Sequence, residues 1–235
     1  MNNQYMDSAK PEGSAGKYAS VPEEEKQRLN CKAVAFDLFG TLVRRTYKSN
    51  CYRELFWMIE IDPEDGRRLA MTMNLGLSRL AEELVPDHGL YLDDLEEDLR
   101  KDLSGIVLYD DTIETLASLH DSGIPIALIS NLAQPYAEHA LRLLETTLGF
   151  KFNTVAFSCE LGMLKPQPNI FLTASERLKI VPENIVMVGK NYRDDISGAE
   201  AVGMARLLLD RNGWYVPEER TIKTLLQVVQ SIDGR

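Results

Sequence analysis

Short apolar runs and amphipathic stretches alternate along most of the chain. Five apolar runs, each bounded by turn residues, span 32–38, 124–130, 153–158, 184–189 and 205–210. Runs of this length suit strands that are covered on both faces. Stretches with helical spacing of apolar positions span 110–122, 135–148, 168–178, 193–202 and 217–232. This alternation predicts an α/β fold with a doubly wound, mostly parallel, Rossmann-like sheet.

One long segment after the first predicted strand breaks the alternation. Residues 44–106 contain no convincing strand, and their amphipathic stretches lie at 47–60, 63–85 and 92–103. We expect an all-helical cap insert here, placed over the carboxyl edge of the sheet. The α/β core then consists of residues 28–43 and 107–235. Residues 1–27 are polar and have no hydrophobic period, so we expect a disordered tail.

Composition and charge narrow the possible partners. The chain of 235 residues has a formal net charge of −10, which works against sequence-independent binding of nucleic acid. A small anionic substrate is still compatible, because a local positive pocket can exist within a negative surface. No stretch approaches the roughly 20 apolar residues that span a bilayer, and the first residues lack the apolar region of a secretory signal. The three cysteines show no CxxC spacing, so we expect a cytoplasmic protein without nucleic-acid or membrane partners.

Polar side chains lie at or just beyond the carboxyl ends of four of the predicted strands, at the edge where doubly wound sheets bind ligands. In chain order they are Asp37 and Thr41; Ser130 and Asn131; Lys165; and Lys190, Asn191, Asp194 and Asp195. Each group alone has a simpler explanation, such as a helix cap for Ser130 or a surface loop for Lys165. Because the carboxyl ends of parallel strands meet at one edge, we predict that the four groups converge on one site.

These residues lie in four stretches that resemble the motifs of a known family. The stretches are FDLFGTL (36–42), ISN (129–131), GMLKPQPNIF (162–171) and VGKNYRDDISGA (188–199). In this order they are similar to the haloacid dehalogenase superfamily of aspartate-nucleophile hydrolases. The resemblance covers residues 32–43 and about 107–210, and it implies the same core fold. The predicted helical insert looks like the family's small helical cap.

The resemblance also implies roles for individual residues. Asp37 would attack phosphorus or an activated carbon and form a covalent intermediate, with Ser130 and Lys165 completing the catalytic set. The substrate-binding residues would be Thr41, Asn131, Lys190 and Asn191. Mg²⁺ prefers an octahedral shell of oxygen atoms. Its ligands would be Asp37, the backbone carbonyl of Phe39, Asp194 and Asp195.

Two positions depart from the phosphatases of this family. Phe39 stands where they usually carry a second Asp, the general acid for the leaving oxygen, and it cannot donate a proton. General acid catalysis typically contributes roughly 10²–10⁴-fold to rate. Lys190 stands after Gly189, where the fourth motif usually has an Asp. If Lys190 points into the site, it places a positive charge where a metal ligand is expected. Phe39 and Lys190 together therefore weaken the expected Mg²⁺ site.

Three functions remain open at this point. A small-molecule phosphatase with weakly held Mg²⁺ ranks first, because the length of the fourth motif fits phosphatases. The aromatic Phe39 and Asn191 favour the second, a metal-independent hydrolase of the 2-haloacid dehalogenase type. Its halide-binding candidates, by location, are Arg44, Arg45 and Arg53. The third is a non-catalytic binding or scaffold protein, in which Lys190 forms an ion pair with Asp37 or Asp195.

Overall fold

A six-stranded parallel sheet forms the centre of the computed structural model, which describes residues 28–215 and 220–233. The tail expected at residues 1–27 lies outside the described residues. The strand order is β6-β5-β2-β7-β8-β9. In that order the strands are Thr154–Phe157, Ile126–Ser130, Ala33–Phe36, Ile185–Gly189, Ala205–Leu209 and Thr221–Ile222. The predicted α/β class with a doubly wound parallel sheet is therefore confirmed.

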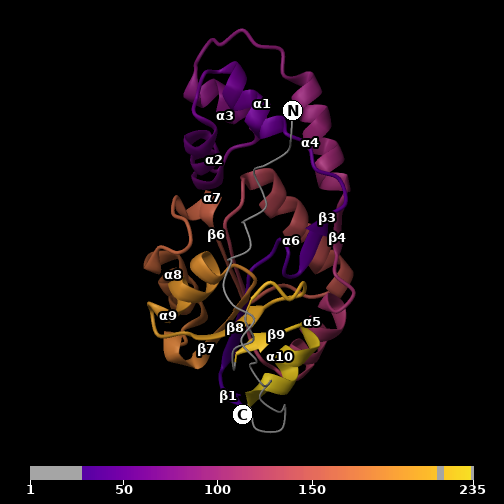
Figure 1. Ribbon diagram of the computed structural model, residues 1–235, viewed down its shortest axis with the longest axis vertical. Coiled ribbons are helices and arrows are strands. Elements are labelled where there is room, and N and C mark those ends of the chain that lie inside the picture. The colour runs from indigo at the N-terminus through magenta and orange to yellow at the C-terminus, as the bar shows by residue number, and fades with distance from the viewer. Residues whose placement is uncertain (1–27, 216–219, 234–235) are drawn as a thin grey trace.

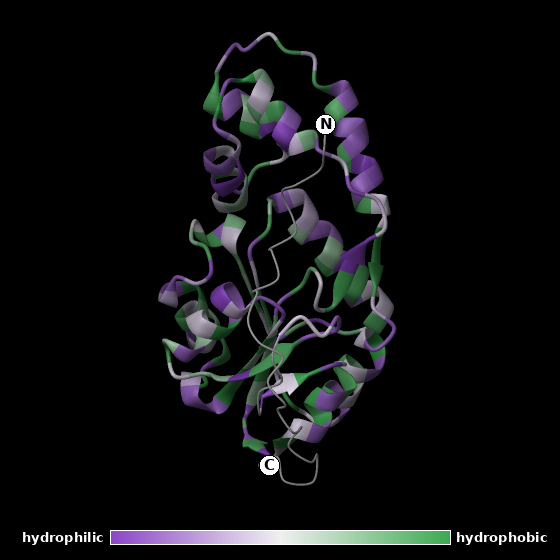
Figure 2. Cartoon of the chain, in the orientation of Figure 1, coloured by the Kyte–Doolittle hydropathy of each residue, from purple (hydrophilic) through white to green (hydrophobic). Residues whose placement is uncertain are grey.

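Helices cover both faces of this sheet (Figure 1). One face carries α5 (Thr112–Asp121), α6 (Gln134–Leu148) and α10 (Leu226–Ser231). The opposite face carries α8 (Pro168–Leu178) and α9 (Gly198–Glu200). Apolar residues gather on the strands, and hydrophilic residues lie on the outward sides of the helices (Figure 2). This pattern explains why the strands appear in the sequence as unbroken apolar runs.

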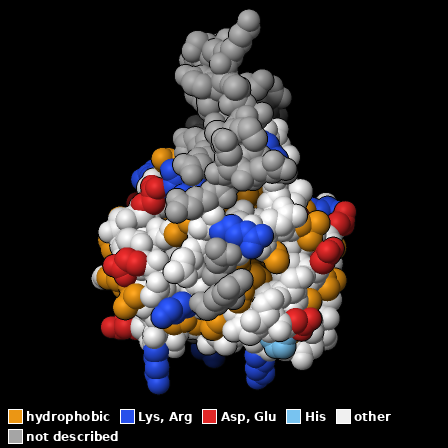
Figure 3. All heavy atoms as spheres, turned by 90° about the horizontal axis from the view of Figure 1, so that it is seen from below, with side chains coloured by type: hydrophobic (Ala, Val, Ile, Leu, Met, Phe, Trp, Pro, Cys, Tyr) orange, Lys and Arg blue, Asp and Glu red, His pale blue; other side chains and the backbone are white. Residues whose placement is uncertain are grey.

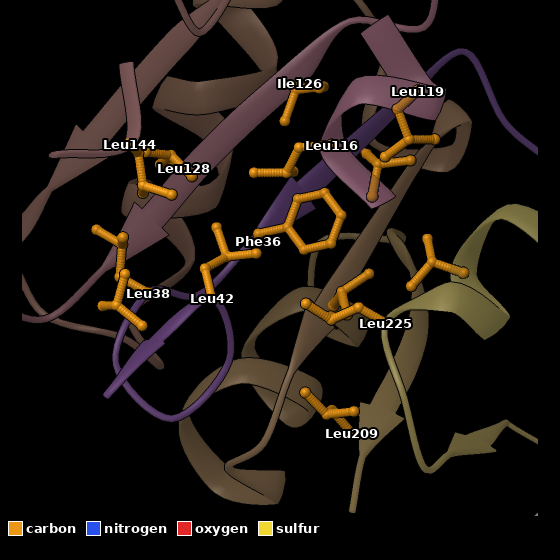
Figure 4. Close-up of a cluster of buried hydrophobic side chains, with 14 of the residues drawn as sticks. Phe36, Leu38, Leu42, Leu116, Leu119, Ile126, Leu128, Leu144, Leu209 and Leu225 are labelled. Atoms are coloured by element: carbon orange, nitrogen blue, oxygen red, sulfur yellow. The ribbon is translucent and has the colours of Figure 1, made fainter. Parts of the chain in front are cut away.

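The central strand β2 anchors the two hydrophobic layers. Its alternate side chains point to opposite faces, as the pleat requires. Val34 and Phe36 join the cluster under α5 and α6, whereas Ala33 and Ala35 join the cluster under α8. Figure 4 shows Phe36 surrounded by leucine and isoleucine side chains from several elements. Burial of such a side chain contributes roughly 1.5–3 kcal/mol, so the end of β2 is held on a well-packed base.

Four helices occupy the segment between β3 (Val43–Arg45) and β4 (Ile106–Leu108), and we call this segment the helical insert. They are α1 (Cys51–Met58), α2 (Pro63–Thr72), α3 (Leu77–Leu84) and α4 (Asp93–Ser104), and they share their own apolar cluster. Figure 1 shows the insert at one end of the molecule. α2 contacts α7 (Ser158–Leu161), and α4 contacts α6. Because α7 and α6 begin where β6 and β5 end, the insert lies at the carboxyl edge of the sheet.

The structure corrects three details of the sequence prediction. Residues 44–106 are not free of strand, because β3 and β4 pair antiparallel and reach into both ends of that range. The stretch 193–202 forms a π-helical turn, η3 (Tyr192–Ser197), before α9. The helix predicted at 217–232 is shorter, since β9 precedes it and α10 begins only at Leu226. Residues 216–219 lie outside the described part.

Several short elements complete the described chain. β1 (Leu29–Asn30) and β10 (Ile232–Asp233) form a parallel pair, and the 3-10 helix η2 (Pro182–Asn184) precedes β7. On the face shown in Figure 3, acidic and basic side chains are interspersed with apolar ones. No helix in the described ranges is long and apolar enough to cross a membrane.

Candidate active site

The site is built around Asp37, the first residue after β2. This strand lies between β5 and β7, so the chain winds away from it in both directions. Such a switch point is where doubly wound sheets bind ligands. The backbone N–H of Asp37 donates to the Val188 carbonyl at 2.9 Å, which ties the residue to the end of β7. The carboxylate is therefore fixed at the centre of the sheet edge.

The two carboxylate oxygens of Asp37 have different surroundings. Oδ1 accepts hydrogen bonds from Ser130 Oγ at 2.9 Å and from Lys165 Nζ at 2.8 Å. Oδ2 accepts one from Thr41 Oγ1 at 3.1 Å, and Lys190 Nζ lies 3.9 Å away. The structure thus brings together residues from all four of the strand ends that the sequence singled out.

The ammonium groups keep the Asp37 carboxylate ionised. Burial alone would raise its pKa, but attraction to Lys165 and Lys190 and the hydrogen bonds from Lys165 and Ser130 outweigh burial and lower the pKa from 3.8 to about 2. A carboxylate must be ionised to act as a nucleophile. Asp37 is in that form throughout the neutral range.

Lys165 is fully engaged as a donor. Its Nζ donates to Asp37 Oδ1, to Asp195 Oδ1 at 2.5 Å and to the Ile129 carbonyl at 2.8 Å. An ammonium group has three donors, and these contacts use all of them. Burial would lower the pKa of Lys165, but attraction to Asp195 and Asp37 raises it above its usual value. Lys165 is therefore a permanent buried cation that joins two carboxylates.

Asn131 holds the Lys165 loop in place. Its Nδ2 donates to the Lys165 carbonyl at 3.0 Å, and its Oδ1 accepts from the Lys165 N–H at 2.8 Å. Both polar atoms of the amide are thus occupied by one backbone unit. The contacts within the described chain give Asn131 a positioning role, and the substrate contact expected from the sequence stays a prediction.

Asp195 is the second carboxylate that the Lys165 ammonium binds. Its Oδ2 accepts from the Asn191 N–H at 2.9 Å. Burial and the nearby Asp37 raise its pKa, while Lys165 opposes that shift. A Cβ on Gly189 would stand 2.4 Å from Asp195 Oδ2, so only glycine leaves room for this carboxylate.

Asp194 and Asn191 face each other at the start of η3. Asn191 Oδ1 accepts from the Asp194 N–H at 3.0 Å, and Asn191 Nδ2 donates to Asp194 Oδ2 at 3.1 Å. These contacts are those of a helix cap. The structure therefore brings Asp195, and not Asp194, to the charged cluster with Asp37.

The residues do not fit the Mg²⁺ site implied by the resemblance. Within residues 28–215 and 220–233, no group of three or more His, Cys, Asp and Glu side chains is placed to hold a metal ion. Asp37 and Asp195 both bind the same ammonium group, and a second ammonium, that of Lys190, lies beside Asp37. The backbone carbonyl of Phe39 stays a prediction as a ligand. The donor set is that of two carboxylates balanced by two ammonium groups.

Phe39 packs against a residue that the sequence did not single out. Its half-buried ring meets the Tyr136 ring edge to face, with 6.1 Å between centroids. Tyr136 lies in the first turn of α6, just beyond the end of β5. Its position near a predicted strand end is the feature of the sequence that could have identified it. The Tyr136 hydroxyl donates to Asp102 Oδ2 at 2.7 Å, so this contact joins the site to α4 of the helical insert.

Asp102 is the buried centre of the contact between the helical insert and the core. Its carboxylate accepts from the Ser49 N–H at 2.6 Å, from Ser49 Oγ at 3.0 Å and from Arg45 Nη1 at 3.3 Å, besides the Tyr136 hydroxyl. Arg45 is thereby committed to Asp102. Arg44 and Arg53, the other two halide-binding candidates, are exposed.

Arg211 supports the turn after Asp37. Its Nη2 donates to the Thr41 carbonyl at 3.0 Å, and its two Nη atoms each lie 2.8 Å from an oxygen of Asp111. Nothing in the sequence pairs positions 211 and 41. This residue was missed because the contact exists only once the sheet has formed.

Comparisons with known proteins show the family and the fold of the chain. A family model described as "Hydrolase: haloacid dehalogenase-like hydrolase" matches residues 31–203. A glyceraldehyde 3-phosphate phosphatase of Methanopyrus kandleri is 36% identical over 113 residues, which are 48% of this chain and 47% of that protein. The chain thus matches about half the length of this curated relative.

Solved structures show the same fold. The crystal structure of a HAD phosphatase from Thermococcus onnurineus has a TM-score of 0.61 and 27% identity, covering 86% of this chain and 99% of that one. A 2-haloacid dehalogenase from Pseudomonas syringae pv. Tomato DC3000 has a TM-score of 0.60 and 22% identity, covering 86% of this chain and 97% of that one. The second likeness concerns the fold alone.

Proposed function

Since the chain belongs to the haloacid dehalogenase-like hydrolases, we propose that it hydrolyses a phosphate ester of a small molecule with Asp37 as the nucleophile. The observation that supports this most is the ionised Asp37 carboxylate, which two ammonium groups and two hydroxyls surround at the switch point of the sheet. The similarity to a protein named a phosphatase favours a phosphate ester as the substrate class.

Oδ2 of Asp37 is the attacking atom in this proposal. Oδ1 already accepts two hydrogen bonds, one of them from a buried ammonium group. Oδ2 accepts only the Thr41 hydroxyl among the described hydrogen bonds, and it lies on the side of the half-exposed Lys190. The less engaged oxygen keeps more electron density for attack. Lys165 and Ser130 hold Oδ1 and so orient the carboxylate.

The chemistry proceeds in two displacements. Oδ2 attacks phosphorus, the bond from phosphorus to the ester oxygen breaks, and its electron pair leaves on that oxygen. Water then attacks the phosphorus of the aspartyl phosphate. The bond from phosphorus to Oδ2 breaks, which regenerates the carboxylate and releases phosphate and a proton. Splitting one hard displacement into two is the gain from a covalent intermediate.

Phe39 sets a preference among leaving groups. A side chain without an exchangeable proton stands two residues after the nucleophile, and its ring is packed against Tyr136. A departing alkoxide must then take its proton from water, whereas a phenolate or carboxylate leaves without one. Because general acid catalysis contributes roughly 10²–10⁴-fold, we expect alkyl phosphates to react at least about 100-fold more slowly than aryl or acyl phosphates.

A second candidate is a hydrolase of the 2-haloacid dehalogenase type. Phe39 favours it, because halide is a leaving group that needs no proton. Lys190 also favours it, since an ammonium beside Asp37 is compatible with displacement in the absence of Mg²⁺. Against it, Arg45 is bound to Asp102 and is not available for a halide.

A substrate panel tests the proposal and separates the candidates. Acetyl phosphate, p-nitrophenyl phosphate, glycerol phosphate and 2-chloropropionate are assayed for phosphate or chloride release, each with Mg²⁺ and with EDTA. We expect hydrolysis of the first two, loss of that activity in Asp37→Asn, and no change in Asp121→Asn, an exposed control at the end of α5.

Each other result selects a different function. Chloride release that survives EDTA selects the dehalogenase type. Release of neither phosphate nor chloride selects the non-catalytic alternative, in which Lys190 serves as the ion-pair partner of Asp37. Ester hydrolysis that persists in Asp37→Asn contradicts the nucleophile assignment.

A further inference from the structure

Lys190 reaches the site by a defined route. It follows Gly189, the last residue of β7, and its backbone carbonyl accepts a hydrogen bond from the Tyr215 hydroxyl at 3.3 Å. A Cβ on Gly40 would stand 2.2 Å from Lys190 Cε and 2.4 Å from Cδ. The aliphatic stem of Lys190 therefore occupies the space that the missing side chain of Gly40 leaves free. Gly40, with φ of +81°, fits both the turn and this contact.

The two lysines at Asp37 differ in what they can offer a ligand. The Lys165 side chain is 2% exposed, and all three of its donors are used within the protein. The Lys190 side chain is 46% exposed. Its Nζ lies 3.9 Å from Asp37 Oδ2, beyond hydrogen-bond distance, and it makes no hydrogen bond to any residue in the described part of the chain. Lys190 is thus the ammonium with donors to spare.

The charges at the site balance without a metal ion. Two carboxylates, Asp37 and Asp195, are offset by two ammonium groups, Lys165 and Lys190. An acidic side chain at position 190 would instead leave two uncompensated negative charges. One divalent cation would fill that deficit. With Lys190 in place there is no deficit to fill, and a positive group already lies next to the attacking oxygen.

We infer that Lys190 is the anion-binding residue of this site, and that its ammonium group supplies positive charge in place of a divalent cation. Its ammonium donates to an oxygen of the substrate's phosphoryl group, so that group binds next to Asp37 Oδ2 without Mg²⁺. A point charge of this kind is a common protein partner for phosphate. This contact is the substrate contact of the proposed hydrolase, and it rests on that function for the identity of the bound group. The binding of an anion by Lys190 does not itself depend on turnover.

Calorimetric titration of inorganic phosphate into the chain of 235 residues in EDTA tests this assignment. We expect binding by the unmodified protein and, since a charge-assisted hydrogen bond is lost, roughly 10- to 100-fold weaker binding by Lys190→Met. Lys190→Arg, which keeps the charge, should stay within a few-fold of the unmodified protein. Lys32→Met, an exposed control at the opposite end of β2, should have no effect.

A second titration, with MgCl₂, asks whether position 190 decides metal binding. We expect no Mg²⁺ binding at this site in the unmodified protein and Mg²⁺ binding in Lys190→Asp. The inference is overturned if the unmodified protein binds phosphate only with Mg²⁺ or not at all, if Lys190→Met binds phosphate as tightly, or if Lys190→Asp gains no metal binding. Phosphate binding without ester hydrolysis would instead contradict the proposed function and leave this inference intact.

Discussion

Replacement of Lys165 by methionine tests how the charged cluster is held together. Methionine keeps the unbranched stem but removes the ammonium group, which is buried between Asp37 and Asp195. Two buried carboxylates then lose their shared cation and one backbone carbonyl loses its donor. Removal of one partner from a buried ion pair typically costs about 3–5 kcal/mol. For a chain of this size that corresponds to a fall in Tm of roughly 6–20 °C.

The same change also alters the nucleophile. Burial raises the pKa of Asp37, and Lys165 is the first of the groups that oppose it. Without Lys165 we expect the pKa of Asp37 to rise, so the ionised fraction at mildly acidic pH falls. Activity should then show a new acidic limb that the unmodified protein lacks, which a pH profile of kcat/KM measures.

Lys190→Met is the matched control for stability. The substitution is the same, but Lys190 is half exposed and 3.9 Å from Asp37, so its removal should cost about 1 kcal/mol or less. Urea unfolding followed by circular dichroism compares the two variants. Equal losses of stability for both, or a loss below about 1 kcal/mol for Lys165→Met, would refute the view that Lys165 holds the cluster and Lys190 serves the ligand.

Three further predictions address the turn, the insert and the effect of pH. Gly40→Ala should lower the free energy of unfolding by about 1–2 kcal/mol, because φ is +81° there, and should weaken phosphate binding by displacing the Lys190 stem. Urea unfolding measures the first effect and calorimetry the second, and unchanged phosphate binding would contradict the route assigned to Lys190. Asp102→Ala should lower the free energy of unfolding by about 3–5 kcal/mol, because it removes a buried carboxylate from its partners. Asp98→Ala on the same helix, where the carboxylate lies at the surface with Lys101, should cost less than about 1 kcal/mol, and similar values for the two variants would show that the buried contact contributes little. The folded-state pKa of Asp37 is depressed from 3.8 to about 2, so its ionised carboxylate contributes about 2 kcal/mol to the free energy of unfolding above pH 4, and this is lost as the pH falls toward 2. Urea unfolding at pH 5, 4, 3 and 2 should show a smaller loss of stability with falling pH for Asp37→Asn than for the unmodified protein, and equal losses for the two would speak against the low pKa.

The sheet was predictable because its main strands are buried on both faces. β2 and β7 consist of apolar residues and glycine, and each is bounded by polar or turn residues. The short strands β1, β3, β4, β9 and β10 have two or three residues each, too few to show a period. Their pairing depends on partners far away in the chain, which a local pattern does not contain.

The site was predictable in its membership but not in its geometry. Asp37 follows β2, Ser130 ends β5, and Lys165 lies in the loop beyond β6 and α7, so all three lie at the edge where topology brings strand ends together. The direction of Lys190 was left open by the sequence, because its path depends on the empty space at Gly40. The contact of Tyr136 with Phe39 likewise arises from helix packing.

In the proposed reaction, Asp37 carries the phosphoryl group between the two displacements. Acid quench of the protein during turnover of acetyl phosphate, then reduction with borohydride and peptide mass spectrometry, detects an acyl phosphate as homoserine. We expect homoserine at position 37 in the unmodified protein and none in Asp37→Asn, which should also be inactive. Turnover without any modification at position 37, or with the modified group on another residue, would rule out Asp37 as the nucleophile.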